Sequence, residues 1–421
     1  EEKKAAEEKT YEDTNAPTTL SEGVQAAANN VVSIINNSAN ALKVILRNLK
    51  VDAGDATQNA MTIKGKGNVT LELDGKNELT GGTGCRQPSV YRGSGLDSYD
   101  QTGTLTITDE DKNGSLTAVG GDVVGVVSNS WYGGNGIYAN NLTISGATVT
   151  AVGGGADDRG SNEVSQNGSK GGYGINAKGN VKFSNATVTA TGGSAFSDKT
   201  SVEGGNGLNI ISNGEFIIDS GTNLTATGGS AESKTGYVEG GQGLYLGDLK
   251  KMTVNGATVT LAGGNAKTNS TGYSSEAGVG MGTYSAKDTE ITNSKVTVIG
   301  GDRTGGRTEK ARAVKITIGS KDSFKLNGDT TFTGIGIIQT TVAGDATLVK
   351  EDCKYEYAKI EPEENGKIYT LGDITVTENE DGTKTISGTL TGKKVAGHDY
   401  KVVSIEEPTC TTPGKRVYTC T

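Results

Sequence analysis

Aromatic side chains in the middle of the chain lie beside recurring pairs of glycine and an apolar residue. They are Trp131, Tyr132, Tyr173, Tyr237 and Tyr273, each a few positions before such a glycine or directly beside it. An exposed aromatic ring stacks on the apolar C–H face of a sugar, while nearby polar groups bind the hydroxyls. We therefore predict that these five residues bind carbohydrate. The alternative is that the rings fold back and pin their own loops.

Three glutamates recur with similar regularity. Glu203, Glu239 and Glu276 each stand four residues before one of these glycines. If the repeats stack, the carboxylates come about 5 Å apart. Their repulsion is relieved either by a bridging calcium ion or by side chains that splay into water. Calcium is therefore the one cofactor that we expect here. Further oxygen ligands in the neighbouring insertions are Asp157, Asp158 and Asp198.

These residues must be positioned by a repeat, because two sequence patterns recur with one period of about 36 residues. The first is an apolar residue followed by threonine, and the second is the pair of glycine and an apolar residue. A shared period of this length is typical of repeat architectures. The first pattern is anchored at Leu79, Leu116, Val149, Val188, Leu224, Val259, Val296 and Phe332. The second is anchored at Gly136, Gly174, Gly207, Gly243 and Gly280.

Each repeat has the alternation of β-strands. Leu142 and Ile144 alternate with polar neighbours, and so do Val149 and Ala151. One repeat is too small to bury its own apolar face, so the repeats must stack. We expect an all-β, right-handed parallel β-helix (solenoid) of about eight coils over residues 20–340, with long loops on one side. A β-propeller is the competing repeat fold, and it fits less well because it needs four strands in each blade.

Two ladders follow from this stacking. Ala118, Ala151, Ala190 and Ala226 should point inward, where small side chains let neighbouring coils approach. The threonines after the anchors should point outward, as an exposed hydroxyl ladder. Flat threonine arrays also bind ice, but the adjoining outward column mixes charge with hydroxyl, which favours the structural interpretation. The threonines are Thr80, Thr117, Thr150, Thr189, Thr225, Thr260, Thr297 and Thr333.

The ends of the chain differ from the repeats. Residues 1–19 are rich in charge and predict a disordered leader, and residues 21–30 allow a short capping helix. Residues 341–396 predict a capping or small β domain, with a hairpin turn at Glu380–Thr383. Residues 397–421 predict a truncated, cysteine-containing tail module. The cysteines are Cys85, Cys353, Cys410 and Cys420.

Composition excludes several classes of protein. The chain has 65 glycines in 421 residues but only 5 prolines and no triplet period, which excludes collagen. Its net charge of −9 argues against nucleic acid as a partner. Because no apolar stretch is long enough to span a bilayer, we expect no membrane insertion. A single histidine and four cysteines leave little for a histidine-based catalyst.

The recurring SGATVTAVGG type of segment, with GGNGI between copies, resembles the β-helical repeats of surface proteins of Gram-positive bacteria. In particular, it is similar to the carbohydrate-binding β-helix domain of secreted clostridial proteins, over about Ala41 to Gly336. The tail, with Pro408 to Thr411 and Tyr418 to Cys420, is similar to a short tandem cysteine module of such proteins. The resemblance implies a secreted or wall-attached, extracellular protein that holds polysaccharide or host glycan.

The functional expectation is therefore an adhesin-like, non-enzymatic carbohydrate-binding protein. One alternative is a calcium-dependent polysaccharide lyase, because lyases on β-helices use acidic residues to hold calcium and a basic residue as the base. Another is a structural or host-protein-binding surface adhesin. No nucleophile, phosphate-loop or zinc motif is present. Candidate bases in the insertions are Arg159, Lys170, Arg303 and Arg307.

Overall fold

The structure is a computed structural model, and it describes most of the repeats and parts of both ends. The described residues are 7–12, 31–55, 58–83, 93–124, 131–159, 168–211, 213–270, 273, 275–283, 288–305, 312–318, 323–327, 330–335, 337–342, 369–370, 374–378, 384–388, 393–394, 400–406 and 415–420. The capping helix predicted at residues 21–30 lies outside these ranges, as do Cys85, Cys353 and Cys410.

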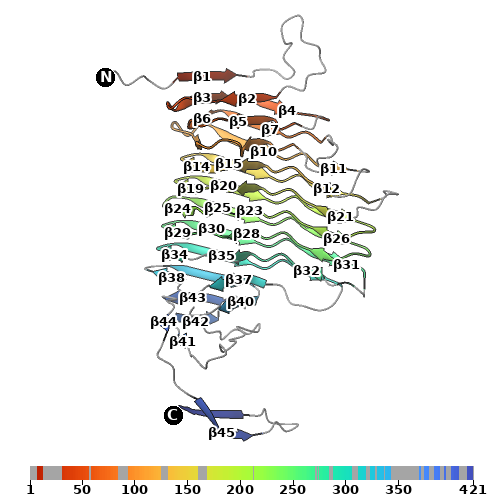
Figure 1. Ribbon diagram of the computed structural model, residues 1–421, viewed down its shortest axis with the longest axis vertical. Coiled ribbons are helices and arrows are strands. Elements are labelled where there is room, and N and C mark those ends of the chain that lie inside the picture. Colours follow the sequence, from red (N-terminus) through yellow and green to blue (C-terminus); the bar gives the residue numbers. More distant parts are fainter. Residues whose placement is uncertain are drawn as a thin grey trace, which may run out of the picture.

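The chain forms a parallel β-solenoid, as the repeat predicted, in which each coil contributes one strand to each of three sheets (Figure 1). We call the three sheets A, B and C, and their strands are given below. Each coil runs through sheet B, then sheet A, then sheet C. Most coils then extend into a projecting arm before they return to sheet B. Parallel stacking pairs each strand with its copies in the coils above and below, which satisfies the backbone hydrogen bonds.

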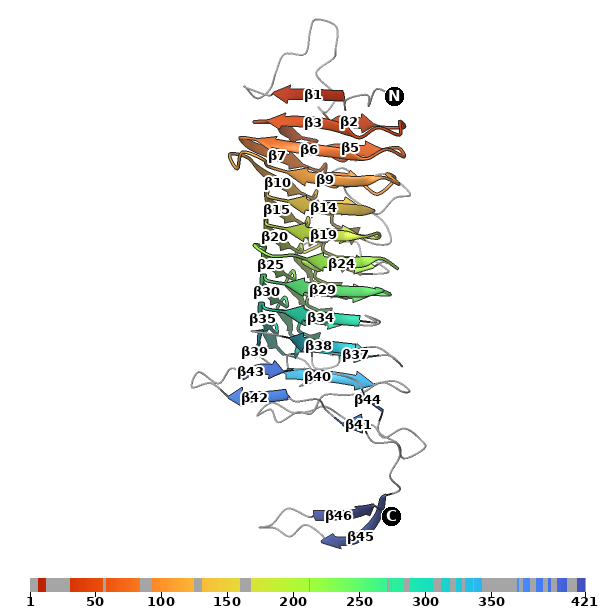
Figure 2. The ribbon, with the colours of Figure 1, turned by 90° about the vertical axis from the view of Figure 1, so that its left-hand side faces the viewer.

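Sheet A forms one face of the solenoid (Figure 2). Its ten strands, in spatial order, are β1 (Glu7–Glu12), β3 (Leu42–Arg47), β6 (Val69–Asp74), β9 (Thr104–Thr108), β14 (Asn141–Ser145), β19 (Val181–Ser184), β24 (Glu215–Ile218), β29 (Lys251–Asn255), β34 (Asp288–Thr292) and β38 (Ser323–Asn327).

Sheet B carries the pairs of glycine and an apolar residue at the starts of its strands. Its ten strands are β2 (Val32–Ile35), β5 (Met61–Lys64), β8 (Leu96–Ser98), β13 (Ile137–Ala139), β18 (Ile175–Ala177), β23 (Leu208–Ile211), β28 (Leu244–Gly247), β33 (Met281–Thr283), β37 (Arg312–Ile318) and β40 (Ile337–Val342).

Sheet C carries the threonine segments. Its eleven strands are β4 (Lys50–Asp52), β7 (Lys76–Thr80), β10 (Ser115–Val119), β15 (Thr148–Val152), β20 (Thr187–Thr191), β25 (Asn223–Thr227), β30 (Thr258–Ala262), β35 (Lys295–Ile299), β39 (Thr331–Ile335), β43 (Lys384–Gly388) and β42 (Ile374–Glu378).

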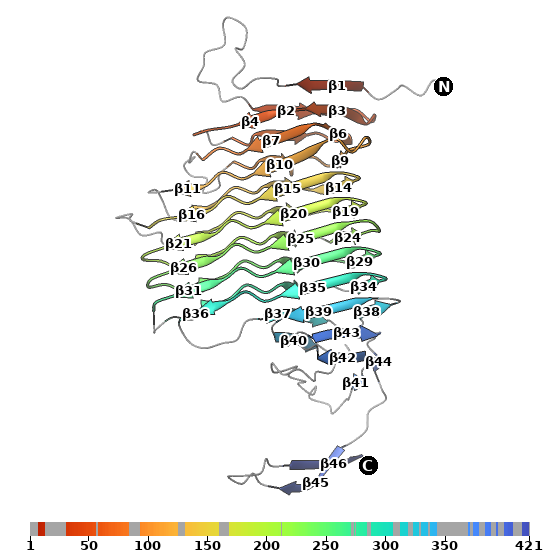
Figure 3. The ribbon, with the colours of Figure 1, turned by 180° about the vertical axis from the view of Figure 1, so that it is seen from behind.

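The polar insertions form the arm, which projects on one side of the solenoid (Figure 3). They were predicted to be loops, but within the described residues they contain two sheets of short parallel strands. The outgoing sheet holds β11 (Val123–Val124), β16 (Ala156–Asp157), β21 (Ala195–Ser197), β26 (Ala231–Ser233), β31 (Ala266–Thr268) and β36 (Arg303–Thr304). The returning sheet holds β12 (Trp131–Tyr132), β17 (Ser169–Lys170), β22 (Val202–Glu203), β27 (Val238–Glu239) and β32 (Ser275–Glu276).

Two separate cores hold these layers together. The main core fills the solenoid with stacked aliphatic side chains, and includes Phe183 and Phe216 in an edge-to-face contact with ring centroids 5.6 Å apart. A second, smaller core lies between the two arm sheets. It consists of Val123, Ala156, Ala195, Val202, Ala231, Val238 and Ala266. The arm is therefore held by its own apolar interior.

The register confirms both sequence ladders in the middle of the chain. Ile137, Ile175, Leu208, Leu244 and Met281 pair strand to strand in sheet B and are all fully buried. In sheet C the four predicted alanines form one buried column, and the threonines from Thr117 to Thr297 form one outward column. Thr333 lies in backbone register with Thr297.

The first member of the threonine ladder was placed wrongly. Strand β7 pairs with β10 so that Asn77 lies opposite Leu116, and Leu79 lies opposite Ala118. Thr80 therefore lies two residues after the ladder position, which Glu78 occupies opposite Thr117. The buried Asn77 side chain fits the inward position because it accepts a hydrogen bond from the Leu49 backbone N–H and donates to backbone carbonyls.

A line of glycines forms the neck between the solenoid and the arm. Glycines of the outgoing and returning segments alternate, and each donates its N–H to the carbonyl of the one before, at 2.8–3.0 Å. A Cβ on Gly154 would lie 2.1 Å from a carbonyl oxygen, so only glycine fits there. The line runs through Gly82, Gly93, Gly121, Gly134, Gly154, Gly172, Gly193, Gly205, Gly229, Gly241, Gly264, Gly278 and Gly301. These glycines let two backbone segments pack directly together.

The ends of the solenoid are covered by additional strands. Within residues 1–19 the structure describes β1, which pairs in parallel with β3. The disordered leader stays a prediction. At the other end, β42 and β43 pair antiparallel, and β43 extends sheet C by pairing with β39. The predicted turn at Glu380–Thr383 lies outside the described residues. Two further antiparallel pairs lie towards the C-terminus: β41 (Tyr369–Thr370) with β44 (Lys393–Lys394), and β45 (Tyr400–Glu406) with β46 (Lys415–Cys420). The described part of the chain contains no helix suited to crossing a membrane.

Candidate functional site

A groove lies in the corner where the arm leaves the solenoid, between sheet B and the returning sheet of the arm. It has two connected parts with volumes of about 680 and about 240 Å³. Both parts share Lys170, Tyr173, Glu203, Asn209 and Ile211, so they form one channel, which we call the corner groove. Because its lining comes from successive coils, the corner groove runs along the solenoid axis.

The floor of the corner groove is a column of outward residues on sheet B. Asp97, Tyr138, Asn176, Asn209 and Tyr245 pair in register on five successive strands, from β8 to β28. Each follows the inward apolar residue of its strand, and strand alternation directs it away from the core. Two tyrosine rings and two amides therefore line the floor.

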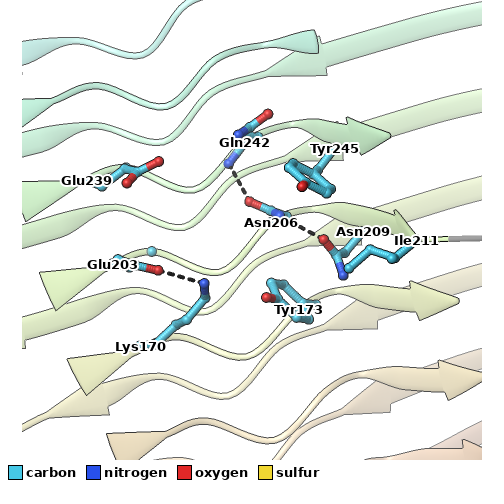
Figure 4. A pocket seen from close by; sticks show the side chains of 11 residues that line it. Lys170, Tyr173, Glu203, Asn206, Asn209, Ile211, Glu239, Gln242 and Tyr245 are labelled. Atoms are coloured by element: carbon cyan, nitrogen blue, oxygen red, sulfur yellow. Dashed lines mark hydrogen bonds and ion pairs between the residues drawn. The ribbon is translucent and has the colours of Figure 1, made fainter. Parts of the chain in front are cut away.

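Amide side chains join the coils along this floor (Figure 4). Asn206 Nδ2 donates to Asn209 Oδ1 at 3.0 Å, and Asn209 Nδ2 donates to Asn176 Oδ1 at 2.9 Å. The backbone N–H of Gln242 donates to Asn206 Oδ1 at 2.8 Å. These bonds orient the amides, which can donate to and accept from a ligand, as the hydroxyls of a sugar require.

The wall of the corner groove is a row of side chains on the returning sheet. Tyr132, Lys170, Glu203, Glu239 and Glu276 pair in register on its five strands. The first four line the groove, and Glu276 continues the row on the next strand, beyond the lining. Lys170 Nζ lies 2.6 Å from Glu203 Oε2. Burial opposes the charged form of Lys170, but Tyr173 and Glu203 outweigh this and raise the pKa of its ammonium group. Lys170 is therefore held as a cation.

The carboxyl group of Glu239, the next in the row, is harder to ionise than that of an ordinary glutamate. Burial first, and then the like charges of Glu203 and Glu276, raise the pKa of Glu239. Tyr237 Oη donates a hydrogen bond to Glu239 Oε2 at 3.2 Å. Burial and the neighbouring glutamates also raise the pKa of the Tyr237 phenol, so it stays a donor.

A cluster of two tyrosines and a lysine lies at the other end of the groove. The rings of Tyr99 and Tyr138 stack with centroids 4.6 Å apart and an interplanar angle of 6°. Lys178 Nζ lies 4.4 Å from the centre of the Tyr99 ring and 5.7 Å from that of Tyr138. Beside them, Asp97 accepts hydrogen bonds from Asn59 and from the Tyr99 backbone, while burial raises the pKa of its carboxyl group. This end combines an aromatic platform with polar groups.

The predicted aromatic residues do not all meet in the corner groove. Tyr132 and Tyr173 line it. Tyr237 directly precedes β27, and its hydroxyl group contacts the Glu239 carboxyl group of the wall. Tyr273 is 54% exposed and lies outside the groove lining. Trp131 belongs to β12, where it pairs with Ser169, but its side chain lies outside the described residues.

The predicted calcium ligands are also divided. Glu203, Glu239 and Glu276 form the stacked row that the spacing predicted. Within the described ranges, no group of three or more His, Cys, Asp or Glu residues could hold a metal ion. Calcium binding by this row stays a prediction.

The aspartates of the insertions lie elsewhere, on the outgoing side of the arm. Asp157 forms an ion pair with Arg159 at 2.6 Å, and Asp198 forms one with Lys234 at 2.8 Å. Asp158 is buried in the arm, where Ser169 and Thr200 donate to it. Of the candidate bases, Lys170 is the one that lines the groove, while Arg303 contacts Ser275. Arg307 lies outside the described residues.

Sequence reasoning missed all five residues of the groove floor and four residues beside it. The missed residues are Asp97, Tyr99, Tyr138, Asn176, Lys178, Asn206, Asn209, Gln242 and Tyr245. Their signal was present, because Tyr138, Asn176, Asn209 and Tyr245 each come directly after the apolar residue of a Gly-apolar pair. Asp97 follows the pair Gly95-Leu96 in the same way, so this offset would have found all five floor residues.

No protein-family model matches this chain, and neither a curated protein nor a solved structure was found to match it. The candidate site therefore rests on the geometry of the chain itself.

Proposed function

We propose that the protein is an extracellular, adhesin-like carbohydrate-binding protein whose ligand is a linear polysaccharide or host glycan lying in the corner groove. The observation that carries the proposal is a groove over five coils with tyrosine rings, amides and charged groups along its length. Rings suit the apolar faces of sugars, and amides suit their hydroxyls. The likeness of the repeats to secreted Gram-positive surface proteins supports an extracellular setting.

The direction of the groove supports a linear ligand. Successive coils are about 4.8 Å apart, as parallel strands are, and this is close to the length of one hexopyranose unit. A linear chain parallel to the solenoid axis therefore meets a new floor residue with each sugar. Five floor positions, from Asp97 to Tyr245, correspond to about five units.

Paired tyrosine variants test this proposal. Tyr173→Ala combined with Tyr245→Ala removes two rings of the groove. Each aromatic contact contributes about 0.5–1.5 kcal/mol, so we expect a loss of affinity of roughly tenfold or more. The measurement is calorimetric titration with the best ligand from a panel of linear polysaccharides.

Tyr273→Ala is the matched control, because Tyr273 is exposed and lies outside the groove. It should bind as the native chain does. If the double variant binds with unchanged affinity, or if Tyr273→Ala alone abolishes binding, the groove is not the carbohydrate site. Circular dichroism of each variant confirms that the solenoid is intact.

A polysaccharide lyase is the second candidate, because Lys170 lies in the groove beside two carboxyl groups. A lyase base must accept a proton from the sugar ring, whereas the Glu203 carboxylate holds Lys170 charged. This favours binding over elimination. Incubation with polygalacturonate and calcium tests the alternative. Unsaturated products that disappear in Lys170→Ala would support a lyase, and their absence across several uronate polymers would contradict it.

A further inference from the structure

The wall of the corner groove changes charge along the solenoid axis. In order along the returning sheet, the row passes from Tyr132 to the cation Lys170, and then to three glutamates on successive strands. The floor beside the glutamates holds the neutral residues Asn206, Gln242 and Tyr245. This half of the groove therefore presents a negative wall above an uncharged floor.

Lys170 shows which group the wall accommodates. Its ammonium nitrogen lies 2.6 Å from Glu203 Oε2, one strand away in register. The next two positions of the row are Glu239 and Glu276, so the wall continues with carboxyl groups. Burial and its two like-charged neighbours destabilise the charged form of Glu239. A positive group of the ligand beside Glu239 would relieve this repulsion as Lys170 does for Glu203.

The floor sets where that positive group would lie. A sugar ring on the Tyr245 side chain has its edge towards the wall, because Tyr245 and Glu239 line the same part of the groove (Figure 4). A substituent on that edge would point towards the side of the groove that Glu239 lines. Asn206 and Gln242 lie between them and suit the remaining hydroxyls.

We infer, on the basis of the proposed function, that the ligand is a linear polysaccharide of amino sugars whose amino groups are unacetylated and positively charged. An ammonium group donates charge-assisted hydrogen bonds to a carboxylate, and these are stronger than neutral ones. An acetylated amino group lacks this charge, and a uronate carboxylate would be repelled by the wall. The negative charge of the wall therefore selects among glycans that would all fit the floor.

A matched pair of oligosaccharides tests the inference. The probes are a hexamer of N-acetylglucosamine and the fully deacetylated glucosamine hexamer, with the same backbone, at a pH at which the amines are protonated. We expect the deacetylated hexamer to bind the native chain about tenfold more tightly. Raising the salt concentration should reduce this preference.

Charge-matched variants locate the effect. Glu239→Gln with Glu276→Gln should abolish the preference, so that the two hexamers bind with about equal affinity. Glu215→Gln with Glu232→Gln removes the same charge from an exposed position of sheet A and from the outgoing arm sheet, where Glu232 pairs with Lys267. This double variant should keep the preference. Circular dichroism establishes that both double variants are folded.

The outcomes separate the inference from the proposed function. Equal binding of the two hexamers overturns the inference but retains the function. A preference that persists in Glu239→Gln with Glu276→Gln also overturns it, because the attraction then comes from the net charge of −9. If neither hexamer nor any neutral linear glycan binds, the proposed function itself fails.

Discussion

Glu239 combines burial, two like-charged neighbours and a hydrogen bond from Tyr237 within one wall of the groove. A side chain in this position does not favour the stability of the empty protein at neutral pH, because ionisation costs more there than in the unfolded chain. Such a residue is typical of a functional site rather than of a structural one. The native fold tolerates the cost because Lys170 neutralises the neighbouring Glu203.

Glu239→Gln should therefore make the chain slightly more stable at neutral pH. The folded pKa of Glu239 is raised, so the folded state keeps its proton to a higher pH than the unfolded state does. Its contribution to stability is present below the ordinary value of 4.5 and is lost as the pH rises through the folded pKa. We expect the variant to melt about 1–2 °C higher at pH 7, as for a change of about 0.5 kcal/mol.

The measurement is thermal unfolding of both chains between pH 4 and pH 8. The two melting temperatures should converge at the acidic end, where both side chains are neutral. A variant that is less stable than the native chain at pH 7, or a difference that does not change with pH, would contradict the account of Glu239.

At the same scale, the sequence predicted some groove residues and missed others for a physical reason. Tyr173 and the glutamates were predicted as binding residues because they recur at fixed positions near glycines. Tyr138 and Tyr245 looked like ordinary outward residues of an exposed strand. Nothing in their local sequence shows that the arm projects beside this part of sheet B, and it is the arm that turns an outward face into a groove.

Among the elements, the arm is the part that creates the site. Its strands are mostly two or three residues long, so each contributes too few alternating positions to be recognised from sequence. A strand of this length is stabilised by its stacked copies and by the small arm core of valines and alanines. The period predicted the stack, but sequence alone did not show that the insertions join it.

The glycine neck fixes the arm to the solenoid, and two adjacent glycines test its role. A Cβ on Gly154 would lie 2.1 Å from the carbonyl oxygen of Gly121, whereas a Cβ on Gly155 meets nothing closer than 3.4 Å. Gly154→Ala should destabilise the chain by about 1–3 kcal/mol, as overpacking does. Gly155→Ala should change stability by less than about 0.5 kcal/mol.

Urea unfolding followed by circular dichroism measures both variants. Gly154→Ala should also weaken glycan binding, because the neck aligns the wall with the floor of the groove. Equal stability of the two variants would show that the neck accommodates a side chain, contrary to its packing.

For the whole molecule, stacking converts single residues into lines of side chains. The solenoid followed from the two sequence ladders, because one period in two patterns places equivalent residues above one another. The error at Leu79 shows the limit of that reasoning, because a buried asparagine replaced the apolar anchor and moved the apparent register by two residues. The corner groove is a property of the whole stack, because its lining comes from several successive coils.

We propose that a linear glycan lies in the corner groove, parallel to the solenoid axis. A crystal structure of the chain with the tightest-binding hexasaccharide tests it most directly. We predict successive sugar units over Tyr138, Asn176, Asn209 and Tyr245, with one unit for each coil. Sugar density over the threonine ladder of sheet C, or beside Tyr273 and away from the groove, would contradict the claim.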